Sequence, residues 1–424
     1  MNIFLNGIIE LFLKITEMHK LFIFHSLLSS LPHIFSELTK NKKPQEQYLI
    51  AYVFREFGIV LQQFPRGDQS LNLELSLTAL QIVLKIFTYN AFSSDWANTQ
   101  HYLGNAYLNR IRGKRADNIE RAINSFELAL QIFSHDTFPM EWASTQNNLG
   151  IAYNHRIRDE HSDNIERAID SFELALQVYT RDAFPTRWAN TQRNLGNAYL
   201  NRIREKRADN IERAIASFEL ALQVYTRNAF PFDWANTQNN LGIAYRDRII
   251  GEHSDNIEQA ISAFQLALNI YTLKIVPEAW ATTRANLSSC LIHDGQWQEG
   301  LQLLLNSVTH LSTSDAPLTH ANSLYQTGRA YEVLGDLDKA RTYYRDALRL
   351  YEYLKDQLGT TQSRAGLGSV LVSQGYLEKG LNELEKVRDG DGYLLLPKDT
   401  QTEFDNIYQA AKRALERSNN EVYV

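Results

Sequence analysis

A tryptophan that returns every 46 residues constrains the fold of this chain more than any other feature. The positions are Trp96, Trp142, Trp188, Trp234 and Trp280. After the first four, the chain reads Leu-Gly-x-Ala-Tyr, and a second segment with the pattern of residues 118–131 (NIERAINSFELALQ) then recurs. A period of this length is typical of arrays in which one supersecondary unit stacks on copies of itself. The sequence therefore predicts a solenoid whose neighbouring repeats share a continuous core.

Both segments of the repeat carry apolar residues at helical spacing, which predicts helices near residues 96–112 and 118–134 and at their 46-residue equivalents. Small residues such as Gly104 and Ala122 leave room for large residues on the facing helix. Asp117, with Glu120 three residues later, is the predicted N-cap of the second helix. The proline of a recurring Phe-Pro pair then separates one helix pair from the next.

The repeat continues beyond the tryptophans in both directions, and it shortens to 40 residues after Trp280. We expect an all-α chain of about eight antiparallel helix pairs. The predicted parts are N-terminal capping helices in 1–49, five 46-residue pairs in 50–279, three 40-residue pairs in 280–399, and a closing helix with a tail in 400–424. A polar closing helix is what the end of a solenoid requires.

Composition excludes several classes of function. The formal net charge of −6 argues against a nucleic-acid partner. The single cysteine, Cys290, excludes a disulfide within the chain and favours a reducing, cytoplasmic location. The apolar N-terminus has neither a signal-peptide pattern nor an uncharged run long enough to span a membrane, so we interpret residues 3–38 as capping helices. Membrane-surface association stays open as an alternative.

Residues 321–355 carry the pattern of a known family. The matching positions are Leu324, Gly328, Tyr331, Ala340, Tyr344 and Ala347. This pattern resembles the tetratricopeptide repeat, and the longer 46-residue unit resembles the tetratricopeptide regions that precede CHAT domains, which are caspase-like protease modules. No residues here match the CHAT domain itself, because Cys290 replaces a small core residue of a first helix. The resemblance implies a right-handed superhelical solenoid whose first helices line a concave groove that binds proteins or peptides.

Asparagine recurs one residue before the Leu-Gly pair, although it is a mediocre helix former. This row comprises Asn148, Asn194, Asn240 and Asn286, and further polar residues that fall on the same predicted face are Asn147, Arg193, Asn239, Asn190 and Asn236. An amide can donate to and accept from a peptide backbone, and the row resembles the asparagine ladders of kinesin-light-chain-like arrays. Three alternatives remain open: the asparagines bridge neighbouring helices, they are inherited by duplication, or they form a solvated face.

An arginine also recurs near the end of each first helix, at Arg110, Arg156, Arg202 and Arg248. Pairing with Glu120-type residues, complementing the helix dipole and binding an anion are the possible roles. Other chemistry is not expected. His161 and His253 lie two repeats apart, too far to share a metal ion, and Asp389–Gly392 departs from a calcium loop and is predicted to be a turn. We predict no catalytic residues, no metal site and no cofactor.

These observations favour a non-enzymatic scaffold that binds a protein or an extended peptide segment in its groove. One alternative is a self-assembling or membrane-peripheral protein that acts through the apolar N-terminal helices. Another is a regulatory partner of a separately encoded protease or signalling enzyme, which rests on the family resemblance alone. The identity of the partner and the oligomeric state do not follow from the sequence.

Overall fold

The computed structural model describes residues 21–64, 67–156, 158, 160–311, 316–390, 392–396 and 398–421. The chain divides into two compact units at Val224–Tyr225. The first unit contains α2 (Leu21–Thr39), α3 (Pro44–Gln63), α4 (Gln69–Val83), α5 (Ser93–Asn109), α6 (Arg115–Ala129), α7 (Pro139–Asn154), α8 (His161–Val178), α9 (Pro185–Asn201) and α10 (Arg207–Leu222).

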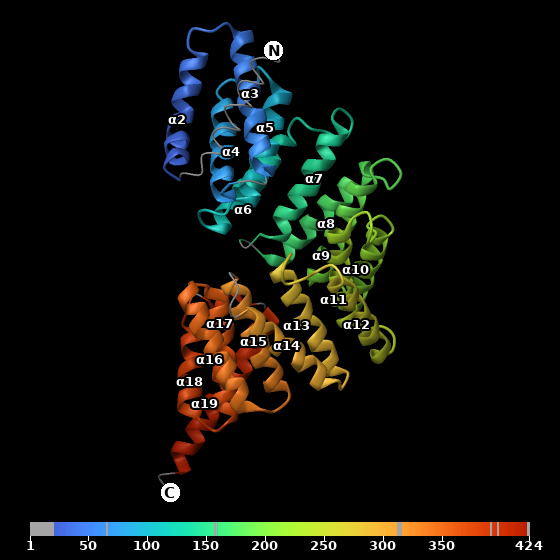
Figure 1. The fold of residues 1–424 in the computed structure, drawn as a ribbon, viewed down its shortest axis with the longest axis vertical. Helices are drawn as coiled ribbons and strands as arrows, with labels where there is room; N and C mark the ends of the chain where they lie inside the picture. The colour runs from blue at the N-terminus through green and yellow to red at the C-terminus, as the bar shows by residue number, and fades with distance from the viewer. Residues whose placement is uncertain are drawn as a thin grey trace. The chain divides into compact units, whose positions relative to one another are not determined.

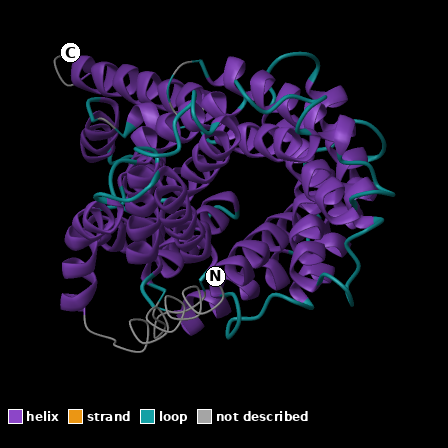
Figure 2. Cartoon of the chain, turned by 90° about the horizontal axis from the view of Figure 1, so that it is seen from above, coloured by secondary structure: helices purple, strands orange, loops and turns teal. Residues whose placement is uncertain are grey.

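The second unit continues the same alternation of helices (Figure 1). It contains α11 (Pro231–Arg246), α12 (His253–Leu268), α13 (Pro277–His293), α14 (Trp297–Leu311), α15 (Pro317–Val333), α16 (Leu337–Leu354), α17 (Gln357–Ser373), α18 (Leu377–Arg388), the short 3-10 helix η1 (Tyr393–Leu395) and α19 (Lys398–Glu421). Figure 2 shows helices and loops, and the described residues contain no strand. The predicted all-α solenoid with eight helix pairs, from α3–α4 to α17–α18, is confirmed.

Each 46-residue pair closes on a contact between a glycine and an aromatic ring. A Cβ atom added to Gly150 on α7 would lie 2.7 Å from a ring carbon of Phe172 on α8. Gly104 and Phe126 make the same contact in the pair α5–α6. Because the ring lies directly on the glycine, no larger residue fits without moving one helix. The predicted pairing of small with large residues is therefore confirmed.

The helix boundaries differ from the predicted ones by about three residues. Helix α6 begins at Arg115, so Lys114 is its N-cap residue and Asp117 lies inside the first turn. The N-cap prediction for Asp117 was wrong for a local reason. The Asn118 side chain donates to the carbonyl oxygen of Arg112 at 2.9 Å and holds the preceding loop, so the chain turns into the helix earlier. The Asp117 carboxylate instead pairs with Arg158 of the next repeat.

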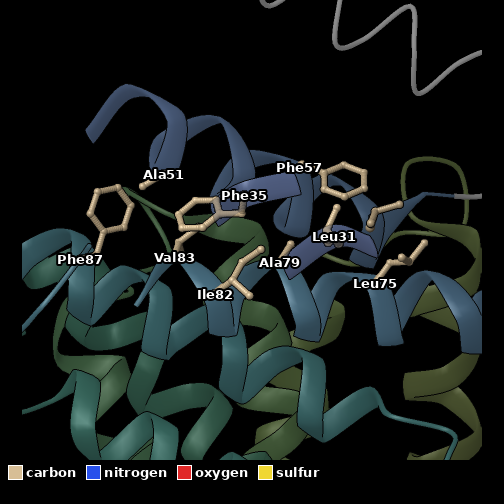
Figure 3. Close-up of a cluster of buried hydrophobic side chains, with 10 residues drawn as sticks. Leu31, Phe35, Ala51, Phe57, Leu75, Ala79, Ile82, Val83 and Phe87 are labelled. Carbon is tan, nitrogen blue, oxygen red and sulfur yellow. The ribbon is translucent and has the colours of Figure 1, made fainter. Parts of the chain in front are cut away.

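The N-terminal helix α2 covers the first pair. Its Leu31 and Phe35 are buried in an apolar cluster with Ala79 and Val83 of α4 (Figure 3). This supports a capping role for the described part of the predicted cap, whereas residues 3–20 lie outside the described residues. No helix in the described part of the chain combines the length and the apolar character needed to cross a bilayer.

The closing helix α19 packs on α18 at the other end of the array. Phe404 and Tyr408 of α19 are buried with Leu384 and Val387 of α18. The segment before it, which includes the predicted turn at Asp389, follows directly on the end of α18 at Arg388. The helix that the sequence predicted near 400–418 is confirmed, and its apolar face completes the core of the last pair.

Ala214 and Arg213 on α10 test the phase of the helices. Ala214 is completely buried, whereas the Arg213 side chain is about half exposed, at 51%. We expect Ala214→Leu to lower the free energy of unfolding by about 1–3 kcal/mol through overpacking. Arg213→Ala should change it by no more than about 0.5 kcal/mol. Urea denaturation of both variants checks this, and equal losses would contradict the helix phase.

Candidate functional site

The asparagine row lies on first helices, as predicted. Asn147 and Asn148 are on α7, Asn190, Arg193 and Asn194 are on α9, Asn236, Asn239 and Asn240 are on α11, and Asn286 is on α13. All of these residues are half-buried except Asn236, which is exposed. The row therefore runs along one face of each unit and is partly accessible to a ligand.

In the first unit, the amides bridge neighbouring first helices. Asn148 of α7 donates to Asn105 Oδ1 of α5 at 2.8 Å. Asn194 of α9 donates to Asn147 Oδ1 of α7 at 3.3 Å, and the Thr191 hydroxyl donates to the same oxygen at 3.1 Å. The bridging role is thus one that these residues perform. Each amide offers two donors and two acceptor positions, so further bonds to a ligand remain a prediction.

The second unit repeats the same bridge. Asn286 of α13 donates to Asn239 Oδ1 of α11 at 3.4 Å, and Thr283 Oγ1 donates to that oxygen at 3.0 Å. Asn239 in turn donates to Asn240 Oδ1 at 3.3 Å. The same amide therefore receives the same two donors in both units, which gives neighbouring helices a fixed register.

A histidine occupies the equivalent slot on α5. The Thr145 hydroxyl donates to the Glu141 carbonyl, so His101 Nδ1, 2.8 Å from Thr145 Oγ1, must be the donor of that contact. The Nε2 atom then accepts from Asn105 Nδ2 at 3.2 Å. This arrangement requires a neutral ring. Burial, with a smaller contribution from the charge of Arg187, lowers the pKa of His101 to about 4.

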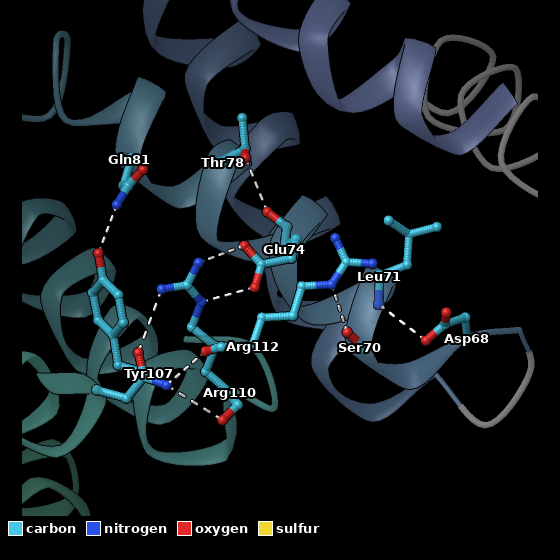
Figure 4. Close-up of polar contacts among 10 residues, drawn as sticks. Asp68, Ser70, Leu71, Glu74, Thr78, Gln81, Tyr107, Arg110 and Arg112 are labelled. Carbon is cyan, nitrogen blue, oxygen red and sulfur yellow. Dashed lines mark hydrogen bonds and ion pairs between the residues drawn. The ribbon is translucent and has the colours of Figure 1, made fainter. Parts of the chain in front are cut away.

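Arginines at the ends of first helices pair with glutamates of the preceding second helix. Figure 4 shows the guanidinium of Arg110 bound by both Glu74 oxygens, at 2.7 and 2.8 Å. Arg156 binds Glu120 in the same two-pronged way at 2.8 and 2.7 Å, and Arg202 binds Glu166. The hydrogen bond to Arg156 lowers the pKa of Glu120. The pairing interpretation is confirmed for these three arginines, and the resulting clasp holds successive pairs together.

Two adjoining hollows open on the first helices of the second unit. The smaller hollow, about 140 Å³, is lined by Arg246, Ala285, Asn286, Ser288, Ser289, Ile292, His293, Leu304, Gln326, Arg329, Ala330 and Val333. The larger hollow, about 650 Å³, is lined by Asn322, Tyr325, Gln326, Arg329, Glu332, Val333, Tyr344, Gln362, Ala365, Gly366, Ser369, Leu384, Leu396, Thr400, Glu403, Phe404 and Ile407. Gln326, Arg329 and Val333 of α15 line both, so the two hollows form one continuous groove.

Of the predicted candidates, Asn286 lines the smaller hollow, and the remaining lining residues were missed. A signal for them was available. Counting forward by 40 residues from Asn286 gives Gln326 and Gly366, which both line the larger hollow. The prediction followed the residue type, asparagine, and not the position in the repeat. It therefore ended where the amide changed to glutamine and then to glycine.

The chemistry of the site is that of binding. Cys290 is completely buried, and burial raises the pKa of its thiol to about 11, which keeps it protonated and unreactive. Within the described ranges, no cluster of histidine, cysteine, aspartate or glutamate side chains could hold a metal ion. The groove instead offers amides, hydroxyls and a few charged side chains beside an apolar wall.

Asn147 is the centre of the bridge in the first unit, so we expect its removal to weaken the fold. Asn147→Ala leaves Asn194 and Thr191 without their shared acceptor and should cost about 1–3 kcal/mol of unfolding free energy. The exposed Asn236 provides the control, because Asn236→Ala should stay within about 0.5 kcal/mol. Denaturation midpoints measure both. A neutral Asn147→Ala would contradict a structural role for the bridge.

The neutral ring of His101 predicts a dependence of stability on pH. Its pKa is about 4 in the folded chain and near 6.5 in the unfolded chain, so below pH 6.5 the unfolded state takes up the proton first. Stability should fall between pH 6.5 and 4, by about 3 kcal/mol in total from this group. His101→Asn, which carries the residue found at Asn147 and Asn239, should remove this part of the slope.

His155 and His320 also have lowered pKa values because of burial, so the test is the difference between the two proteins. Denaturation of the wild type and of His101→Asn across this pH range supplies it. Parallel curves would contradict the assignment of a neutral, buried ring.

Comparison with known proteins agrees with this architecture. Residues 279–352 match the family model described as tetratricopeptide repeat. A search of the curated proteins finds no match. The apo form of RapI is similar in structure, with a TM-score of 0.51 and 14% identity over 92% of this chain and 99% of that chain. The apo form of the quorum sensor NprR from B. thuringiensis has a TM-score of 0.54 and 13% identity over 88% and 97% of the two chains.

The two structures share the fold of this chain at low sequence identity. The family match lies where the repeat is 40 residues long, and the 46-residue pairs before it repeat the same glycine and aromatic positions. The match, the helix pairs and these recurrent contacts together identify the chain as a tetratricopeptide-repeat protein.

Proposed function

We propose that this protein is a non-enzymatic, cytoplasmic scaffold that holds an extended segment of a partner protein in the groove of its second unit. The observation that carries the proposal is the pair of adjoining hollows along α13, α15 and α17, which α19 walls at one end. Ligand sites in proteins are concave, largely apolar, and supplied with a few polar groups that orient the ligand. The groove has this composition.

The lining suits a peptide backbone. Asn286, Gln326 and Gln362 present amides from three successive first helices, and each amide both donates and accepts. Leu384, Leu396 and Phe404 supply an apolar wall for side chains. A chain laid across successive first helices would meet an amide at each helix, so the asparagine row of the sequence and the glutamines of the groove belong to one proposed binding face.

Site-specific cross-linking tests the proposal directly. A photoreactive amino acid at Gln326 on the groove, compared with one at the exposed Gln298 on α14, would be irradiated in extract of the source cell. We expect Gln326 to yield one partner protein, cross-linked within one short segment, and Gln298 to yield none. Products that are absent, or scattered over many proteins, would contradict the proposal.

A peptide with the sequence of the cross-linked segment then gives a quantitative prediction. Gln362→Trp fills the larger hollow and should weaken binding by roughly ten-fold or more, which corresponds to about 1.4 kcal/mol. Gln298→Trp adds the same side chain to an outer helix and should bind like the wild type. Fluorescence anisotropy with the full chain measures both affinities, and equal losses would indicate a non-specific effect.

A second candidate function is self-association through the N-terminal end, which rests on a different surface. Ile34 and Leu38 of α2 and Leu49, Tyr52 and Val60 of α3 are exposed apolar residues. If this surface joins two copies, size should rise with concentration in sedimentation, and Leu49→Lys with Val60→Lys should abolish that rise. The changes leave the buried contacts of α2 in place. A size that stays constant in the wild type would exclude this candidate.

A regulatory role toward a separately encoded protease or signalling enzyme rests only on the resemblance to CHAT-associated repeats. It needs the same groove and makes no separate structural demand. The identity of the cross-linked partner decides it.

A further inference from the structure

The two hollows of the groove differ in charge. The residues that line the smaller hollow include Arg246, His293 and Arg329 but no aspartate or glutamate. Arg246 is paired with Asp247 through its Nε atom at 2.8 Å, and Asp247 itself does not line the hollow. The Arg329 guanidinium makes no hydrogen bond or ion pair within the described part of the chain, and its side chain is exposed. The smaller hollow is therefore complementary to an anionic group.

A buried hydroxyl points to a ligand in the same hollow. Ser288 lines it, has no exposed surface, and its Oγ atom has no hydrogen-bond partner among the described residues. Leaving such a group unpaired costs about 1–3 kcal/mol. A carboxylate held between Asn286 and Arg329 would accept the missing bond, because an ionised acceptor attracts hydroxyl donors strongly.

The larger hollow carries the opposite charge. Glu332 is half-buried and accepts hydrogen bonds from Tyr344 Oη at 2.5 Å and from Ser369 Oγ at 3.1 Å, but it forms no ion pair with a described residue. Glu403 on α19 lines the same hollow and is likewise without a cation among the described residues. The Tyr325 and Tyr344 rings lie nearby, with centroids 5.8 Å apart.

These walls fit a basic side chain better than a neutral one. Lysine and arginine bury an apolar stem and keep the charged group near an acceptor. Leu384, Phe404 and Ile407 would contact the stem, while the two carboxylates and the tyrosine rings would receive the charge. Arg329 alone provides a positive charge in this hollow, and it lies at the boundary shared with the smaller hollow.

We infer that the groove selects a segment carrying one acidic and one basic residue in a fixed order, the acidic one in the smaller hollow and the lysine or arginine in the larger. This rests on the proposed binding function and adds the charge pattern and the direction of the bound chain. The direction follows because the two hollows lie in sequence along α13, α15 and α17, so reversing the order of charges would place each against its own kind.

A library of short random peptides displayed on phage, selected against the full chain, tests this even before the natural partner has been identified. We expect the selected peptides to share an acidic and a basic residue at a constant separation and in one order. In Glu332→Gln with Glu403→Gln, the preference for lysine or arginine should disappear while the acidic residue is still selected. The control, Glu299→Gln with Glu378→Gln, removes two exposed charges from outer helices and should select as the wild type does.

Measured affinities then test which charges meet. Replacing the basic residue of a selected peptide by alanine should weaken binding to the wild type roughly ten-fold, and should have little effect on the Glu332→Gln, Glu403→Gln variant. Ser288→Ala should weaken the same peptide without lowering the melting temperature, because it removes an unpaired buried hydroxyl. A loss of melting temperature would assign the hydroxyl to the fold.

The outcomes separate the two levels of the proposal. Selected peptides that bind in the groove without a shared charge pattern, or with the pattern reversed, would overturn this inference and leave the proposed function standing. A library from which no peptide is enriched by the full chain would count against both. Peptides whose binding is unchanged in Gln362→Trp would place the site elsewhere and overturn both.

Discussion

The structure depends on the contact between a glycine of each first helix and an aromatic ring of its partner. At Gly150 and Phe172 the ring lies where a Cβ atom would otherwise be, so the two helices approach closely and their remaining side chains interlock. The same contact at Gly196 and Phe218 gives the next pair the same geometry. Because every such pair has one shape, pairs can stack in a regular series, and a row of first helices results.

Polar contacts then fix how one pair meets the next. The Arg156–Glu120 ion pair joins the end of a first helix to the second helix before it, and the Asn194–Asn147 bridge joins successive first helices. The asparagines therefore have a structural part that must be separated from any role in binding. In the second unit, the repeat shortens and the bridging amides give way to larger and smaller residues, and it is there that the hollows open.

The fold followed from the sequence because the period is long, repeated and marked by unambiguous residues such as Trp142 and Gly150. Helix ends did not follow as well, because Asn118 binds the carbonyl of Arg112 and shifts the start of α6, an interaction that no local pattern announces. The site was predicted only at Asn286. Its other half depends on α19, whose approach to α17 and α18 is a tertiary event, and on positions such as Gly366 that carry no chemical signature alone.

The arginine clasp has a consequence for how such an array changes in length. Arg156 binds the glutamate 36 residues before it, and Arg202 binds the glutamate at the same separation. Loss of the 46 residues from Pro139 to Phe184 would therefore bring Arg202 opposite Glu120, an equivalent partner in an equivalent place. Neighbours are interchangeable, so unequal recombination within the gene can add or remove whole repeats while every interface that remains is still complementary.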